Sequence, residues 1–139
     1  MNTHRIFIAS ALVVAAGCAP GPDSGDEDIG ENAEAISTFT FFRSPTGKIR
    51  CVAGGGELRC DVAGWNDEAI FLGRGVNAEA RIAPAFDSVG DPSAEVLPYD
   101  TPKTFGSFRC IVRATTGMRC VGLRSLRGFE VSTANTRMF

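Results

Sequence analysis

Five cysteines are the residues of this chain whose type and spacing suggest covalent chemistry. Four of them, Cys51, Cys60, Cys110 and Cys120, each follow an apolar residue and an arginine, whereas Cys18 follows an apolar N-terminal segment. Four cysteines of an exported protein favour disulfides, and they allow three pairings. The alternative chemistry is a zinc site, but the sequence lacks the closely spaced cysteine pairs of zinc ribbons and fingers. We therefore expect two disulfides, and no metal or cofactor.

The pairing that we favour joins Cys51 to Cys60 and Cys110 to Cys120. Each pair flanks a turn that contains glycine, so each disulfide would cross a single β-hairpin and close a loop of about ten residues. The alternative is a pair of disulfides between the hairpins, which would tie the two sheets of a sandwich together. In the favoured pairing the first hairpin places Arg50 opposite Asp61. The second hairpin then has these residues on its inner face: Phe108, Cys110, Val112, Met118 and Cys120.

Cys18 is the candidate for lipidation. A short basic start precedes an apolar segment at residues 6–16, which is too short to cross a bilayer because a spanning helix needs about 20 apolar residues. The segment ends in Ala15-Ala16-Gly17-Cys18, which resembles the lipobox of bacterial lipoproteins. We expect a signal peptide at residues 1–17 and an acylated Cys18, of the palmitate type, that anchors the protein to a membrane of the cell envelope. The alternative is a secreted protein with an unmodified Cys18.

Residues 18–36 differ in composition from the rest of the chain. After Cys18 they contain six acidic residues and two prolines but no basic or aromatic residue. Such a segment cannot bury enough apolar surface to become ordered. We expect the lipidated cysteine to be followed by a disordered acidic tether, and a single domain to occupy residues 37–139.

Turn-forming residues recur every eight to twelve residues in this domain and separate short β-rich stretches. That spacing is typical of an all-β fold, and no window shows a sustained helical pattern. We expect a small antiparallel sandwich or barrel of short strands, braced by the two disulfides. The expected strands are 39–43, 48–53, 57–62, 69–72, 80–83, 108–114, 118–123 and 129–133.

The order of several motifs resembles a family of small exported bacterial domains whose function is not characterised. The motifs are F-x-S-P-x-G-x-I-x-C at residues 42–51, Leu97-Pro98-Tyr99, the hairpin of Cys110 and Cys120, and Gly128-Phe129. They span most of residues 41–130. The chain departs from the family in lacking a further cysteine pair between Cys60 and Cys110. The resemblance implies no catalytic residue.

Few residues of the chain are suited to catalysis. Its only histidine, His4, lies in the expected signal peptide, so the usual base for activating a serine or cysteine is missing from the mature chain. Four carboxylates, Asp67, Glu68, Asp87 and Asp91, lie in the irregular middle of the domain. A glycosidase needs only two carboxylates at a set separation, although solvated loop acids are the more ordinary explanation. We therefore expect that the protein is not an enzyme. The alternative function is a carboxylate-based hydrolase acting in the envelope.

Arginine provides the stronger functional candidate. The net charge is −2, yet residues 37–139 hold thirteen Lys and Arg against ten Asp and Glu. On a strand, an arginine next to a buried cysteine points to the opposite face, and its guanidinium is suited to carboxylates and phosphates. We expect a non-enzymatic binding or structural domain that contacts an anionic envelope polymer or a protein partner, and no nucleic acid. The ordinary alternative is that the arginines are only the solvated side of amphipathic strands. The candidate residues are Arg50, Arg59, Arg109, Arg113 and Arg119.

Overall fold

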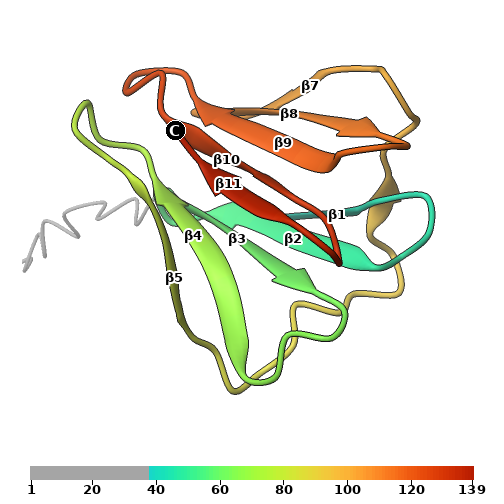
Figure 1. Cartoon of the computed structure of the whole chain (residues 1–139). Coiled ribbons are helices and arrows are strands. Elements are labelled where there is room, and N and C mark those ends of the chain that lie inside the picture. The colour runs from blue at the N-terminus through green and yellow to red at the C-terminus, as the bar shows by residue number, and fades with distance from the viewer. Residues whose placement is uncertain (1–37) are drawn as a thin grey trace, which may run out of the picture. The chain divides into compact units, whose positions relative to one another are not determined.

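A computed structural model describes residues 38–139, and the expected signal peptide, lipidation at Cys18 and acidic tether lie outside the described residues. The described residues form two β-sheets that face each other across a hydrophobic core (Figure 1). They contain eleven strands and no helix, so the expected all-β fold is confirmed. No helix long and apolar enough to cross a membrane is found among them.

The larger sheet has six strands in the order β5-β4-β3-β2-β1-β6. Neighbouring strands pair in antiparallel fashion except β1 and β6, which run parallel. The strands are β1 (Thr40–Arg43), β2 (Ile49–Gly54), β3 (Glu57–Val62), β4 (Glu68–Gly73), β5 (Ala80–Pro84) and β6 (Glu95–Val96).

The smaller sheet has five strands in the order β11-β10-β9-β8-β7, all antiparallel. Its strands are β7 (Lys103–Phe105), β8 (Phe108–Arg113), β9 (Gly117–Gly122), β10 (Gly128–Val131) and β11 (Thr136–Met138). All eight expected strands are present in the two sheets, with ends shifted by at most two residues. The sequence did not indicate β6, β7 and β11, which are two or three residues long and mostly exposed.

Both disulfides lie within hairpins. Cys51 bonds to Cys60 across β2 and β3, and Cys110 bonds to Cys120 across β8 and β9. In each hairpin the two cysteines are directly opposite each other, with Cα atoms 4.1 and 4.2 Å apart. The hairpin pairing is therefore confirmed, and the alternative disulfides between hairpins are wrong. The register of the first hairpin also places the residue before Cys51, Arg50, opposite Asp61 as expected.

Alternation of side chains along the strands builds the core. In β8 and β9 every second residue is buried, and five of these six are the residues expected on the inner face of the second hairpin; the sixth is Gly122. Contacts between the sheets are close: the rings of Phe42 and Phe105 stack with centroids 3.9 Å apart, and Cys51 Sγ lies 3.3 Å from Met118 Sδ. All core side chains lie between residues 42 and 131, so the domain contains its own hydrophobic core and both disulfides.

Candidate functional site

The five candidate arginines lie on two different sheets. Arg50 and Arg59 extend from the outward side of the six-stranded sheet, on β2 and β3. Arg109, Arg113 and Arg119 extend from the outward side of the five-stranded sheet, on β8 and β9. Because the sheets face each other across the core, their outward sides point in opposite directions. The five arginines therefore do not form the single cationic face that the sequence suggested.

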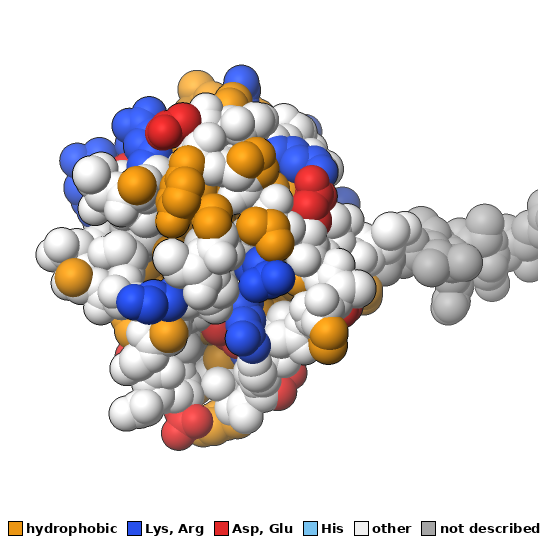
Figure 2. Space-filling view, turned by 90° about the vertical axis from the view of Figure 1, so that its right-hand side faces the viewer, with side chains coloured by type: hydrophobic (Ala, Val, Ile, Leu, Met, Phe, Trp, Pro, Cys, Tyr) orange, Lys and Arg blue, Asp and Glu red, His pale blue; other side chains and the backbone are white. Residues whose placement is uncertain are grey.

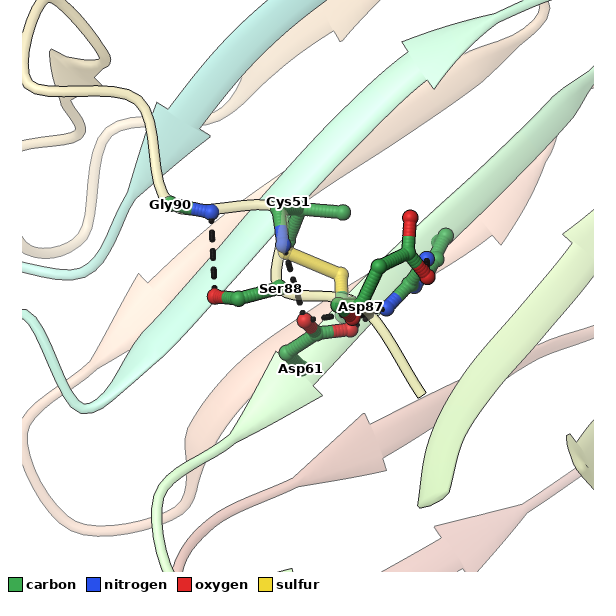
Figure 3. A network of polar contacts seen from close by, with 8 residues as sticks. Cys51, Asp61, Asp87, Ser88 and Gly90 are labelled. Carbon is green, nitrogen blue, oxygen red and sulfur yellow. Dashed lines mark hydrogen bonds and ion pairs between the residues drawn. A yellow bond between two sulfur atoms is a disulfide. The ribbon is translucent and has the colours of Figure 1, made fainter. Parts of the chain in front are cut away.

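Arg59 is occupied by an internal network. Its Nε lies 2.9 Å from Asp61 Oδ1 and its Nη1 lies 2.8 Å from Asp87 Oδ1, while Nη2 also donates to the carbonyl oxygen of Asp87. The backbone N–H of Val89 donates to Asp61 Oδ2 at 3.0 Å, and Figure 3 shows Asp61 beside the loop that carries Asp87 and Ser88. The Arg59 side chain is only 14% exposed. It holds the loop after β5 against β3, and it is not available to a ligand.

The same network shifts two pKa values. Burial lowers the pKa of Arg59, but its hydrogen bonds and charge attraction with Asp61 and Asp87 outweigh burial and leave the pKa raised. In return, the hydrogen bond from Arg59 holds the pKa of Asp87 below its usual range. The pKa of Asp91 is also lowered, but by hydrogen bonds from the hydroxyl and backbone of Ser93.

These shifts predict how the loop responds to acid. Since the pKa of Asp87 is lower in the folded than in the unfolded state, its contribution to stability is complete above the unfolded pKa of about 3.9 and is lost as the pH falls through the folded pKa. In the variant Arg59→Met we expect the pKa of Asp87 to rise toward its usual range, because the hydrogen bond and the charge of Arg59 are lost, and the Val89 amide to exchange faster, both measured by NMR. Asp91 should keep its lowered pKa in this variant, because Ser93 and not Arg59 causes it. An unchanged pKa of Asp87 would contradict the assignment.

Arg50 does not form an ion pair with Asp61, the residue opposite it in the hairpin. Asp61 forms its ion pair with Arg59, and Arg50 Nε donates to the carbonyl oxygen of Gly47 at 3.3 Å.

Figure 2 views the domain from the right-hand side of Figure 1, where the chain turns from β1 into β2. Basic side chains on this face lie in separate groups between apolar and uncharged ones, so they do not merge into one continuous cationic surface.

The three arginines of the five-stranded sheet, Arg109, Arg113 and Arg119, form what we call the arginine cluster. Arg109 lies opposite Val121, Arg119 lies opposite Ile111, and Arg113 lies opposite a glycine, so no two arginines are directly paired. Arg119 is diagonal to both other arginines, and diagonal neighbours on adjacent strands are about 7 to 8 Å apart. This arrangement brings three positive charges within reach of one ligand while avoiding direct opposition of like charges.

The arginine cluster forms no ion pair with the described part of the chain. None of its three side chains forms an ion pair or a side-chain hydrogen bond with another described residue. Glu130 is the only carboxylate on β8 to β11, and it lies between Arg119 and Arg137 in the register of β9, β10 and β11. The guanidinium of Arg119 instead lies over the ring of Phe139, 4.1 Å from its centroid. Such cation–π contact supports the side chain and leaves its charge available.

A hollow of about 320 Å³ lies between Arg109 and Arg119. A guanidinium can bind a phosphate or carboxylate with two parallel hydrogen bonds, and nearby apolar groups strengthen such contacts because they exclude water. The hollow can therefore hold an anionic group together with a small apolar one. The apolar side chains that line it are Pro102, Ile111, Val121 and Leu123.

Sequence reasoning missed part of this surface. Arg137 and Phe139 join it only through β11, a strand of three exposed residues that the sequence did not indicate. The only available signal was the position of Arg137 between Thr136 and Met138, and three residues are too few to show the alternation of a strand.

Three of the four candidate carboxylates come together elsewhere. Asp67, Glu68 and Asp87 line a cavity of about 380 Å³ beside β4, whereas Asp91 lines a separate hollow. Asp87 is engaged by Arg59, and its pKa, like that of Asp91, is shifted downward. A general acid requires the opposite shift. Within residues 38–139 no group of three or more His, Cys, Asp and Glu side chains is arranged to hold a metal ion.

Comparison of the chain with family models, with curated proteins and with solved structures finds no significant match. The family resemblance that we drew from the order of the motifs therefore stays a prediction.

Proposed function

We propose that the protein is an envelope-anchored lipoprotein whose β domain is a non-enzymatic binding module. The lipid on Cys18 would provide the membrane anchor, and the arginine cluster would contact an anionic envelope polymer or a protein partner. The observation that carries this proposal is the contrast between arginines. Arg59 is mostly covered and doubly paired, whereas Arg109, Arg113 and Arg119 form no ion pair with a carboxylate among the described residues.

The geometry of the arginine cluster supports an anionic ligand for a physical reason. Three neighbouring positive charges repel one another, and the surface gains from any ligand that supplies negative charge between them. Arginine is also the side chain best matched to planar carboxylates and to phosphates. Because the contacts lie at the surface, binding should weaken as salt screens the charges.

The test measures retention of the domain on columns that carry polyphosphate or polyglutamate, as a function of ionic strength. The double variant Arg109→Ala/Arg119→Ala should bind at least about tenfold more weakly, which corresponds to 1.4 kcal/mol or more. The matched control is Arg43→Ala/Arg81→Ala, which removes the same charge from the six-stranded sheet and should bind nearly as the native domain does. Retention that does not depend on salt, or an equal loss in the control, would remove this proposal.

The cavity of about 380 Å³ favours one other candidate, a carboxylate-based hydrolase of the envelope. Asp67, Glu68 and Asp87 line it together, and Trp65 lies beside them. Its weakness is Asp87, which Arg59 holds in its ionised form. An assay for new reducing ends after incubation of the domain with envelope polysaccharide distinguishes this function from binding alone.

A further inference from the structure

Four turns and the start of β1 meet at one end of the domain. The backbone N–H of Arg74, in the turn between β4 and β5, donates to Gly56 O in the turn between β2 and β3 at 3.0 Å. Arg127, between β9 and β10, forms an ion pair with Glu79, between β4 and β5. A hollow of about 210 Å³ is shared by Arg74, the turn between β7 and β8, and Thr38. In Figure 1 the loops at residues 73–79 and 123–127 project side by side at the left.

Exposed apolar side chains are concentrated at this end. Leu126 is 75% exposed, Val76 is 60% exposed and Phe39 is 57% exposed. Leu126 also has a φ of 57°, a left-handed conformation that a leucine rarely adopts. Loop tips normally carry polar residues and glycine, so apolar side chains at several adjacent tips indicate a surface that is covered in use. Four of the ten large apolar side chains that are exposed in the described residues lie here: Phe39, Val76, Leu123 and Leu126.

Basic side chains accompany the apolar tips. Arg74 and Arg124 form no side-chain ion pair or hydrogen bond within residues 38–139. Arg124 stands between Leu123 and Leu126, so that cationic and apolar residues alternate along one loop. Apolar residues beside Lys or Arg are suited to the boundary between headgroups and acyl chains, because the apolar group enters the boundary while the cation stays with the lipid phosphates.

We infer that this end of the domain binds the surface of an anionic lipid bilayer, with Leu126 and Val76 inserted among the headgroups and Arg74 and Arg124 bound to lipid phosphates. A bilayer fits better than a protein groove because the apolar residues stand at separate loop tips and are interspersed with cations. The described domain also begins at this end. This placement at the membrane rests on the proposed lipid anchor: Thr38 lies 20 residues after Cys18, so the chain would join the anchor to the domain at this end.

The experiment uses residues 19–139, which contain the complete core and both disulfides but no Cys18, so that binding reports on the domain itself. The protein is sedimented with vesicles of phosphatidylglycerol and phosphatidylcholine in equal parts, and with vesicles of phosphatidylcholine alone. We expect binding to the first vesicles and little to the second. Replacing the tips, in Leu126→Ser/Val76→Ser, should reduce partitioning at least about tenfold. Phe86→Ser/Val96→Ser removes two exposed apolar residues elsewhere and should leave partitioning unchanged.

One further variant distinguishes lipid binding at the loop tips from anion binding at the arginine cluster. The variant Arg109→Ala/Arg119→Ala should lose retention on polyphosphate but keep vesicle binding within about twofold. If this variant loses vesicle binding while Leu126→Ser/Val76→Ser keeps it, the arginine cluster contacts the lipid and the inference is wrong. If the native domain does not bind the anionic vesicles, the inference is also wrong, whatever the result on polyphosphate.

Discussion

Replacement of Gly117 by alanine should lower the free energy of unfolding by about 3 kcal/mol or more. A Cβ atom at this position would lie 2.1 Å from the carbonyl oxygen of Val131 and 2.9 Å from the side chain of Ser132. Gly117 also has a φ of 87°, which an L side chain rarely adopts. The clash is with the backbone of the neighbouring strand β10, so β9 and β10 would have to move apart. Urea unfolding followed by circular dichroism measures the loss.

Gly64 provides the matched control for this prediction. Its φ is 90°, almost the same as that of Gly117, but a Cβ atom there would meet nothing within 4 Å. Gly64→Ala should therefore lose only the conformational part, about 1 kcal/mol. The difference between the two variants measures the backbone clash alone. Equal losses would show that the close approach of β9 and β10 is not what requires a glycine at residue 117.

Removal of the second disulfide, in Cys110→Ala/Cys120→Ala, should lower the free energy of unfolding by about 3 kcal/mol. The disulfide closes a loop with a sequence separation of 10 residues, and its loss returns conformational freedom to the unfolded chain. For a domain of about 100 residues, this corresponds to a melting temperature lower by about 12 to 24 °C. Differential scanning calorimetry of the oxidised protein and the variant measures the shift.

The first disulfide provides a second measurement of the same entropic effect. Cys51 and Cys60 have a sequence separation of 9, so the change in chain entropy predicts nearly the same loss for Cys51→Ala/Cys60→Ala. A loss below about 1 kcal/mol for either pair would contradict the entropic argument. A much larger loss for the first pair would instead indicate packing, since Cys51 contacts Met118 across the core.

Local pattern was sufficient for the hairpins. Cysteine and apolar residues alternate with arginine along β2, β3, β8 and β9, and a period of two residues fixes which side chains face the core. A disulfide between directly opposite residues then sets the register, which is why Arg50 lies opposite Asp61 as expected. These elements were predictable because every determinant lies within a dozen residues.

β6 and the arrangement of the arginines depend on distant parts of the chain. β6 exists because Glu95 and Val96 pair with β1, more than fifty residues earlier. β11 pairs locally with β10, but its three residues are too few to show a periodic pattern. Similarly, nothing around Arg59 in the sequence indicates Asp87, which reaches it through the loop after β5. Interactions between residues far apart in sequence leave no periodic signal in either segment.

The all-β class, the two hairpins, their disulfides and the outward position of the arginines follow from the sequence, because alternation along a strand is a local property. Which arginines share a surface depends on how the two sheets pack. Pairing of two sheets through a common core sends the outward sides in opposite directions, which separates Arg59 from the arginine cluster. Folding also brought Leu126 and Val76 to one end of the domain, since packing of the two sheets places the turn between β4 and β5 beside the turn between β9 and β10.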